Sequence, residues 1–468
     1  MATVRMAHES DGAFVEELIT LMNNSDGWRF FKPDDQIAIE RGEKEFVDAT
    51  VLSRVDDETY RIRYEDTGEE VEVTYERGRF YNLQHSPSML YAWEKHQRRS
   101  DPDGVAYADG LIDDDLVAAL NEDVQRLIDT EPVDYHPGSG TRVRDLVHPS
   151  LYPYVEGLSV ADPPIPDPSV PRPLCDRFGR PFEDSDYQWL PTPFSIDADG
   201  FVEIPHYINN LDRARHSSLY DHLASLFSAA LPLVESVVGY LDCSPFFIAD
   251  GETEEYDLPY SNDYRPSERS GKPAEPTRLR GRELLVIPKL VEYRLEAGGE
   301  THEGVWHVEG MSHEHIVATC VYILHRDDAM AGGSLLFKRA YTQTEAARMY
   351  YGMRQDPPTP ISTMVKEGTI PIGRLDTPQG RLIVFPNSHI HKLTELTVTG
   401  DAKEATRRVI VFWVVDPNIT ELATTREVAP QQEKISREEA LRIRLELMEE
   451  RKRHKQTLNV RAVSLCEH

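Results

Sequence analysis

The segment Trp306-His307-Val308-Glu309-Gly310 is followed much later in the chain by Phe385-Pro386-Asn387-Ser388-His389-Ile390-His391. In a β-strand successive side chains point to opposite faces, so His307 and Glu309 would share one face. A second histidine from a distant strand would complete a set of three ligands. Two histidines and one carboxylate, with open positions opposite, are how non-haem Fe(II) oxygenases bind iron. We therefore predict that His307, Glu309 and His391 are the metal ligands and the catalytic centre.

Arg407 opens a second informative run, Arg407-Arg408-Val409-Ile410-Val411, which reads as a buried strand. A 2-oxoglutarate-dependent oxygenase needs a cation near its last core strand. Arginine can form a bidentate pair with the distal carboxylate of 2-oxoglutarate, while the 2-oxo acid end chelates the iron. Tyr293 and Lys289 precede it on another strand and could hydrogen-bond the co-substrate or the substrate, although a structural role is equally open. The expected cofactors are Fe(II) and 2-oxoglutarate, with Arg407, Tyr293 and Lys289 as binding residues.

The charge balance argues against nucleic acid and anionic membranes as main partners. The chain of 468 residues has 51 basic and 81 acidic residues, a formal net charge of −30, whereas phosphate binding relies on clustered Lys and Arg. Four scattered cysteines show no zinc or CxxC spacing, which favours free thiols in a reducing compartment. We find no apolar leader and no stretch of about 18 apolar residues. We expect a cytoplasmic protein that does not span a membrane, and a nuclear location stays open.

Residues 1–82 are expected to form a small β-barrel-like module. Three short alternating runs, 49–55, 59–64 and 69–75, are separated by turn-forming residues. The pattern resembles an SH3- or Tudor-like barrel, a module that can hold a methylated side chain in an aromatic cage. The cage candidates are Tyr60, Tyr64, Tyr75 and Phe80. The alternative that we favour is that these rings pack the interior of the module.

Residues 83–281 read as a helical and loop-rich region, and residues 282–432 as a β-rich core. Helices are expected at 14–22, 88–98, 113–129 and 217–240, and a polar exposed loop at 250–281. The core runs with strand character are 283–297, 304–309, 316–324, 333–337, 380–385 and 407–415, with an inserted excursion at 349–371. Many short strands with Gly and Pro turns favour a jelly roll, that is a double-stranded β-helix, with flanking helices. The expected fold class is α+β.

Residues 433–468 are expected to form a charged amphipathic helix. Ser436-Arg437-Glu438-Glu439 has the sequence of a capping box. Leu441, Leu445 and Met448 lie at helical spacing and would form one apolar stripe. Such a helix could be a solvated tail or could join two copies of the chain in a homo-oligomer.

Several longer blocks of the sequence resemble a fungal-type family of unknown function whose members carry a 2-oxoglutarate/Fe(II) oxygenase-like core. The resemblance covers roughly residues 85–432. Its blocks include Tyr135-His136-Pro137-Gly138-Ser139, Tyr187-Gln188-Trp189-Leu190-Pro191, Trp306-His307-Val308-Glu309-Gly310-Met311, Gly380-Arg381-Leu382-Ile383-Val384-Phe385-Pro386-Asn387 and Val428-Ala429-Pro430-Gln431-Gln432.

This resemblance places His307, Glu309 and His391 on the metal-binding face and Arg407 before the last core strand. His389 is the alternative second histidine. We prefer His391 because the basic Lys392 and the apolar Leu393 follow it, as usually happens after that ligand. Aspartate is commoner at the carboxylate position, and Glu309 is one methylene longer.

The resemblance implies an O2-dependent oxidoreductase that converts 2-oxoglutarate to succinate and CO2 and hydroxylates a substrate, either a small molecule or a protein. Two alternatives stay open. The first is a cupin-type metal protein that uses His307, Glu309, His313 and His391 without 2-oxoglutarate. The second is a non-catalytic adaptor that reads a modified residue with its N-terminal module.

Overall fold

The structure, a computed structural model, describes residues 5–6, 33–34, 36–41, 46–56, 59–74, 80–82, 104–165, 176, 178, 182, 185–243, 278–340 and 369–458. The helices expected at 14–22 and 88–98 lie outside the described residues. So do nearly all of the polar loop expected at 250–281 and most of the excursion expected at 349–371.

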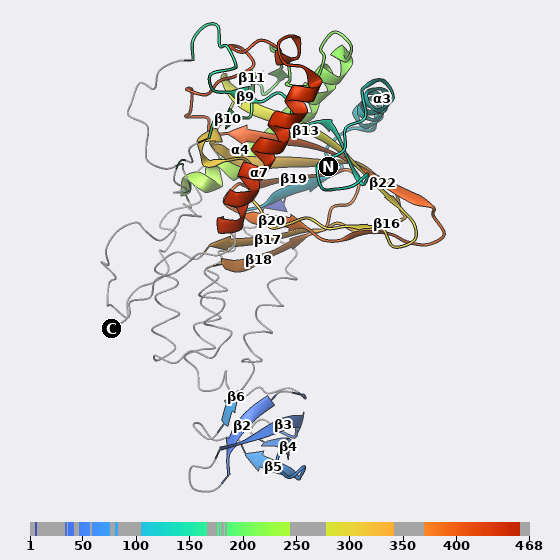
Figure 1. Cartoon of the computed structure of the whole chain (residues 1–468), viewed down its shortest axis with the longest axis vertical. Coiled ribbons are helices and arrows are strands. Elements are labelled where there is room, and N and C mark those ends of the chain that lie inside the picture. Colours follow the sequence, from blue (N-terminus) through green and yellow to red (C-terminus); the bar gives the residue numbers. More distant parts are fainter. Residues whose placement is uncertain are drawn as a thin grey trace, which may run out of the picture.

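The N-terminal strands form a five-stranded antiparallel sheet in the order β5-β4-β3-β2-β6, drawn in blue in Figure 1. Its strands are β2 (Gln36–Glu40), β3 (Phe46–Arg54), β4 (Thr59–Tyr64), β5 (Glu70–Thr74) and β6 (Phe80–Asn82). The three predicted strands are thus confirmed as β3, β4 and β5. Among the described pairings none joins β5 to β6, so closure into a barrel stays a prediction.

For two of the four cage candidates the favoured alternative, packing of the interior, is confirmed. Tyr60 and Tyr64 are buried, and both pack in a core with Ile37, Val51 and Ile62. Alternation along β4 turns these rings inward, where apolar area is removed from water. Tyr75 and the side chain of Phe80 lie outside the described residues.

A nine-stranded antiparallel sheet forms the centre of the molecule, in the order β1-β7-β19-β15-β22-β13-β11-β12, with β8 also paired to β13. Its strands are β1 (Arg5–Met6), β7 (Ala106–Asp109), β8 (Val143–Val147), β11 (Thr192–Ile196), β12 (Val202–Glu203), β13 (Arg282–Glu296), β15 (Ile316–Arg326), β19 (Arg381–Pro386) and β22 (Glu404–Val415). Because β1 belongs to this sheet, the first described residues are not part of the N-terminal sheet.

A smaller antiparallel sheet, β18-β17-β20, faces the large one. It comprises β17 (Leu335–Ala340), β18 (Thr369–Leu375) and β20 (Ile390–Leu393). Phe337 of the small sheet meets Phe385 of the large sheet with ring centroids 5.1 Å apart. Apolar side chains of both sheets share one core, which is where β-branched and aromatic residues of strands gain most from burial. The strands expected at 283–297, 316–324, 333–337, 380–385 and 407–415 are confirmed as β13, β15, β17, β19 and β22.

Two further sheets are minor. β14 (Thr301–His302), β21 (Leu396–Val398) and β16 (Met330–Gly332) form one, and β9 (Tyr154–Val155) with β10 (Tyr187–Gln188) form the other. Two short 3-10 helices, Ser312–Glu314 and Gln431–Glu433, are also described.

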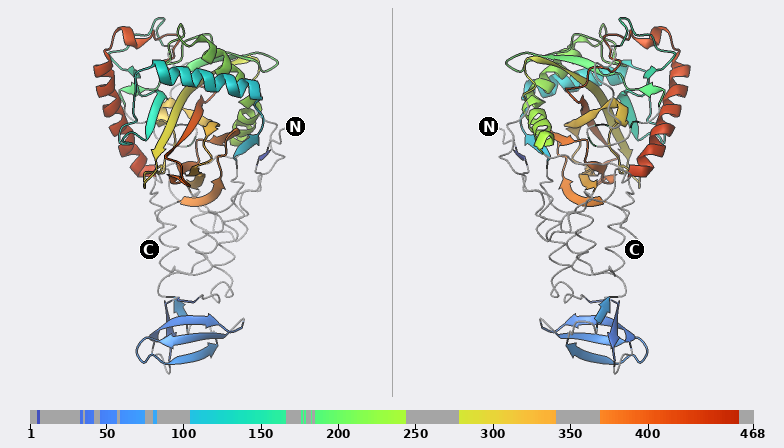
Figure 2. Two further views of the ribbon diagram at one scale, coloured as in Figure 1. Left: turned by 90° about the vertical axis from the view of Figure 1, so that its right-hand side faces the viewer. Right: turned by 90° about the vertical axis from the view of Figure 1, so that its left-hand side faces the viewer.

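Two helices cover the outer face of the large sheet. α3 (Asp114–Thr130) begins after Asp113, whose carboxylate accepts the Leu116 N–H at 2.8 Å. α4 (Ser217–Cys243) packs its apolar side chains into a second core together with strands of the large sheet. Both helices confirm the sequence prediction. In Figure 2, α4 and the C-terminal helix lie on opposite sides of the sheets.

The prediction that the chain has no long apolar stretch is wrong. The segment Ser217–Gly239 of α4 is long and apolar enough to cross a membrane by length and composition, with a mean hydropathy of 1.4. However, 67% of it is buried inside the protein. Residues such as Phe227 and Leu231 are fully buried against the sheet, as in a core helix.

The C-terminal helix, α7 (Arg437–Leu458), packs against the rest of the molecule. The predicted apolar stripe is wrong at Leu445, which is 55% exposed, whereas Leu441 and Met448 are partly buried and pack against apolar cores. The buried apolar positions of the helix are Ala440, Ile443 and Leu447. The capping prediction is confirmed in part, since Ser436 Oγ accepts the Glu439 N–H at 3.2 Å.

Candidate metal centre

The first half of the metal motif does not lie in a regular strand, so the strand predicted at 304–309 is wrong. β14 ends at His302, and His307 then forms an isolated antiparallel bridge with His391. The two residues exchange both backbone hydrogen bonds, at 3.0 and 2.9 Å. A hydrogen-bonded pair of this type holds the two backbones side by side and places both imidazoles on the same side.

A second constraint comes from Asn387, which is fully buried. Its side-chain oxygen accepts the Glu309 N–H at 2.8 Å. Its amide donates to the carbonyl oxygens of Glu309, at 2.9 Å, and Ile316, at 3.0 Å. Asn387 therefore fixes the backbone of the predicted carboxylate ligand. We did not predict this role, although Asn387 lies in the Phe-Pro-Asn block of the second metal-motif segment.

His307, Glu309 and His391 converge in space. Glu309 Oε1 lies 3.5 Å from His307 Nε2 and 3.4 Å from His391 Nε2. The two imidazole centroids are 4.4 Å apart, and the candidate ligand atoms all lie within 4.8 Å of one another. The group has the donor set of two imidazoles and one carboxylate that non-haem iron sites use.

Both histidines have the tautomer that a metal ligand needs. His307 Nδ1 donates to the carbonyl oxygen of Val305 at 2.7 Å, and His391 Nδ1 donates to that of His389 at 3.2 Å. A carbonyl oxygen can only accept, so each Nδ1 carries a proton and each neutral ring keeps its lone pair on Nε2. The Nε2 atoms are the ones that face Glu309. A ligating histidine almost always has such a partner on its other nitrogen.

Glu309 is the negative centre of the group. Burial by itself would raise the pKa of its carboxyl group, but His307 and His391 in their protonated forms hold that pKa well below its usual value through hydrogen bonds and charge. The side chain therefore stays ionised, as a metal ligand must be.

Arg407 is 2% exposed and forms no ion pair among the described residues. Its Nη2 donates to Thr377 Oγ1 at 3.1 Å, and its Nε has no hydrogen-bond partner within the described part of the chain. Burial, together with Arg326, lowers its pKa to about 10, opposed by Tyr293. The guanidinium carbon lies 5.5 Å from the centroid of the Tyr293 ring.

The other buried arginines of the described residues behave differently. Their Nε atoms also lack a partner within the described part of the chain, but each has a carboxylate: Arg444 forms a bidentate pair with Asp134, at 2.6 and 2.9 Å, and Arg451 pairs with the buried Glu314. A buried charge without a partner is strongly unfavourable. Arg407 therefore has an unpaired positive charge, and a bound carboxylate would supply its partner.

The remaining predicted residues are placed as follows. Tyr293 lies directly opposite Arg407 in the pairing of β13 with β22, and Lys289 lies opposite Val411, four residues away. At about 3.3 Å per residue, Lys289 is some 13 Å from Tyr293 along the strand. Tyr293 is thus near Arg407, whereas Lys289, which lies 5.6 Å from the Trp413 ring, is not.

The structure does not bring the other histidines of the motif into the group. His389 is fully buried, with its ring 6.3 Å from that of Phe337. His313 Nε2 donates to the carbonyl oxygen of Tyr187 at 2.9 Å. The centroid of the His302 ring lies 5.4 Å from that of the Tyr293 ring, with 50° between the ring planes. Val308 is buried in the core.

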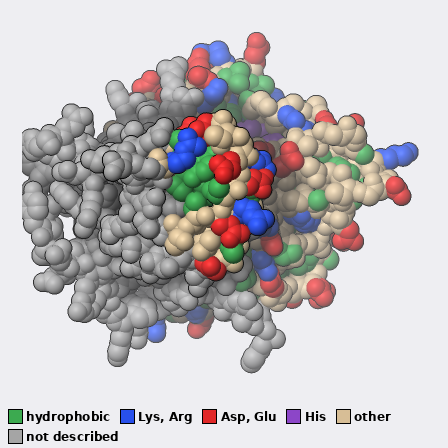
Figure 3. All heavy atoms as spheres, turned by 90° about the horizontal axis from the view of Figure 1, so that it is seen from below, with side chains coloured by type: hydrophobic (Ala, Val, Ile, Leu, Met, Phe, Trp, Pro, Cys, Tyr) green, Lys and Arg blue, Asp and Glu red, His purple; other side chains and the backbone are tan. Residues whose placement is uncertain are grey.

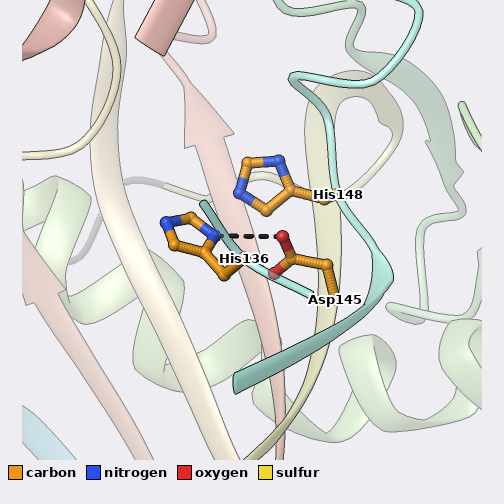
Figure 4. A group of neighbouring side chains, drawn as sticks. All are labelled: His136, Asp145 and His148. Atoms are coloured by element: carbon orange, nitrogen blue, oxygen red, sulfur yellow. Dashed lines mark hydrogen bonds and ion pairs between the residues drawn. The ribbon is translucent and has the colours of Figure 1, made fainter. Parts of the chain in front are cut away.

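A second group, His136, Asp145 and His148, also has ligand atoms within 4.8 Å of one another. Figure 4 shows His136 Nδ1 directed at Asp145, at 3.0 Å. In this group the protonation of His148 does not suit a metal ligand. His148 Nδ1 accepts the Ser150 N–H at 3.1 Å, so its proton sits on Nε2 and neither nitrogen offers a lone pair. Burial also lowers the pKa of His148 well below its usual value, which keeps the ring neutral.

A family described as "Protein of unknown function (DUF4246)" matches the chain over residues 88–439. No curated protein matches it in sequence.

Among solved structures, the IDO from Bacillus thuringiensis is 8% identical, with 68% of this chain and 91% of that chain covered and a TM-score of 0.30. An oxidoreductase of the 2OG-Fe(II) oxygenase family from Burkholderia pseudomallei is 10% identical, with 69% and 89% covered and a TM-score of 0.28. The non-heme alpha ketoglutarate dependent epimerase SnoN from nogalamycin biosynthesis is 13% identical, with 71% and 88% covered and a TM-score of 0.28. The likeness is weak at these TM-scores, and the function inferred below rests on the site.

Proposed function

The chain belongs to the family described as "Protein of unknown function (DUF4246)", and for this member we propose an Fe(II)- and 2-oxoglutarate-dependent oxygenase. The proposed reaction hydroxylates an unidentified substrate with O2 and yields succinate and CO2 from 2-oxoglutarate. The ligands would be His307, Glu309 and His391, and Arg407 would bind the distal carboxylate of 2-oxoglutarate.

The observation that carries this proposal is the pairing of two features. One is a two-histidine, one-carboxylate group in which both histidines present Nε2. The other is a buried arginine, Arg407, which has no carboxylate partner among the described residues and lies on β22, after the second histidine in the chain. A metal protein that needed no carboxylic acid co-substrate would have no use for that unpaired buried charge.

The order of the strands supports the proposal. Strands β13, β15, β19 and β22 belong to the large sheet, while β17, β18 and β20 belong to the facing small sheet. The chain thus passes back and forth between two facing antiparallel sheets, as in a double-stranded β-helix. His391 lies on β20 and Arg407 on β22, so the two sheets together would hold metal and co-substrate between them.

The residues present fit both cofactors. Iron and 2-oxoglutarate, when bound, would supply the oxidising chemistry, and the protein would position them and exclude water. Arg407 would orient the co-substrate by a bidentate contact, with Tyr293 beside it. Phe385 and Phe337 lie 4.7 and 6.3 Å from the ring of His391. These rings would keep water away from one side of the metal.

The cupin-type alternative is less well supported. It requires His313 as a fourth ligand, but among the described residues the group whose ligand atoms lie within 4.8 Å of one another contains His307, Glu309 and His391 and not His313. It also leaves Arg407 without a role. A non-catalytic adaptor is disfavoured by the two aromatic-cage residues that are buried in the N-terminal sheet.

Anaerobic titration of the purified chain with Fe(II) and then 2-oxoglutarate tests the proposal, because chelation by the 2-oxo acid gives a weak visible charge-transfer band. We expect the band in the native chain. His391→Ala should abolish it by removing the metal. Arg407→Gln should still bind Fe(II) but should require a much higher 2-oxoglutarate concentration, since a buried charged contact is lost.

His136→Ala is the matched control, because it removes a histidine from the second group and should leave both binding steps unchanged. Metal bound by the native chain with no band at any 2-oxoglutarate concentration would contradict the proposal and favour the cupin-type reading.

A further inference from the structure

We propose that Arg451 of the C-terminal helix is a positioning residue for the metal centre and acts through Glu314 on the loop that carries Glu309. This inference rests on the proposed metal site. It assigns a functional role to α7, most of which lies beyond the family match that ends at residue 439.

Glu314 is the fixed point of that loop. It is fully buried, and each carboxylate oxygen has two donors. Oε1 accepts the Trp189 N–H at 2.6 Å and one Arg451 Nη group. Oε2 accepts the Met311 N–H at 2.8 Å and the other Arg451 Nη at 2.9 Å. A buried carboxylate is tolerable only with this degree of pairing.

Arg451 is also buried, and it contacts an aromatic ring as well as the Glu314 carboxylate. It is 6% exposed, and its guanidinium carbon lies 3.9 Å from the centroid of the Trp189 ring. Trp189 in turn stacks on Trp413 of β22 at 4.7 Å, with only 16° between the ring planes. A planar guanidinium can make the bidentate contact and the ring contact at once, which an ammonium group cannot.

The connection to the metal is short. Met311, whose N–H Glu314 holds, is two residues beyond Glu309. Between them, Gly310 has φ +66°, and a side chain there would meet Glu314 Oε2 at 2.7 Å and Ile316 at 2.6 Å. The turn after Glu309 is therefore folded tightly over the Glu314 carboxylate. Asn387 fixes the backbone of Glu309 from the other side. The hydrogen bonds of Asn387 and Glu314 together determine the position of Glu309.

The test is the affinity of the full chain for Co(II), followed by its visible absorption as a stand-in for Fe(II). Arg451→Gln should weaken Co(II) binding by roughly tenfold or more, the usual effect of losing a group that orients a ligand. Arg451→Lys keeps the charge but loses the planar fork, so it should restore only part of the affinity. The Lys variant also provides a measurement if the Gln variant does not fold.

Arg444→Gln is the matched control, because Arg444 is equally buried on the same helix but pairs with Asp134. It should lower the melting temperature as Arg451→Gln does and leave Co(II) affinity unchanged. Equal losses of affinity in both variants would overturn the positioning role, because general destabilisation would then explain the effect. Native affinity in Arg451→Gln or in Arg451→Lys would overturn it as well and leave the proposed function standing. Failure of the native chain to bind Co(II) would instead count against the proposed metal site itself.

Discussion

The described residues contain two groups of two imidazoles and a carboxylate, and the groups differ in which ring nitrogens carry protons. In the first group both histidines donate from Nδ1 to carbonyl oxygens and present Nε2 to Glu309. In the second, His148 accepts a backbone N–H at Nδ1. The sequence could indicate only the first, because His-x-Glu is a local pattern, whereas His136, Asp145 and His148 are brought together by loop geometry. The choice of His391 over His389 depends on a turn that the sequence does not specify.

His148 makes the stability of the chain depend on pH. Burial lowers its pKa well below the ordinary value of 6.5, so the folded state keeps it neutral while the unfolded state protonates it. Below about pH 6.5 the unfolded state binds more protons, and the free energy of unfolding falls as pH decreases, by up to about 1.4 kcal/mol per pH unit for one group. His148→Gln should flatten the dependence of denaturation midpoint on pH between about 5 and 6.5. An unchanged slope would show that His148 does not titrate in this way.

The strands were predictable where long β-branched and apolar runs coincide with regular pairing, as in β13, β15 and β22. The prediction failed at 304–309, because only His307 of that segment pairs with a neighbour. It failed again at one position of α7, where apolar spacing indicated Leu441, Leu445 and Met448 but Leu445 is exposed. The helix is turned so that Arg444 and Arg451 reach the carboxylates of Asp134 and Glu314. Ion pairs with distant residues decide that orientation, and no local pattern contains them.

A pair of leucines on α7 tests this orientation. Leu447 is fully buried and Leu445 is 55% exposed. Leu447→Ala should lower the free energy of unfolding by about 2–5 kcal/mol, through lost burial and the cavity left behind. Leu445→Ala should change it by no more than about 0.5 kcal/mol. Chemical denaturation of the two variants measures both changes in the free energy of unfolding. A larger decrease in Leu445→Ala than in Leu447→Ala would contradict the observed orientation of the helix and support the predicted stripe.

At the scale of the whole molecule, the antiparallel core between the two sheets and its covering helices agree with the α+β class read from the sequence. The N-terminal sheet has its own small core, formed by side chains such as Val51 and Ile62. Figure 3 shows acidic and basic side chains interspersed over the described surface on one face, so the net charge of −30 is not gathered there.

Succinate formation from 2-oxoglutarate under air, with added Fe(II), tests the central claim most directly. The native chain should release succinate, slowly in the absence of its substrate. His307→Ala should lose this turnover because a metal ligand is gone, and Arg407→Ala should lose it because the co-substrate carboxylate has no partner. Succinate from both variants at the native rate, or a native chain that holds iron and produces none, would contradict the assignment of this site to 2-oxoglutarate chemistry.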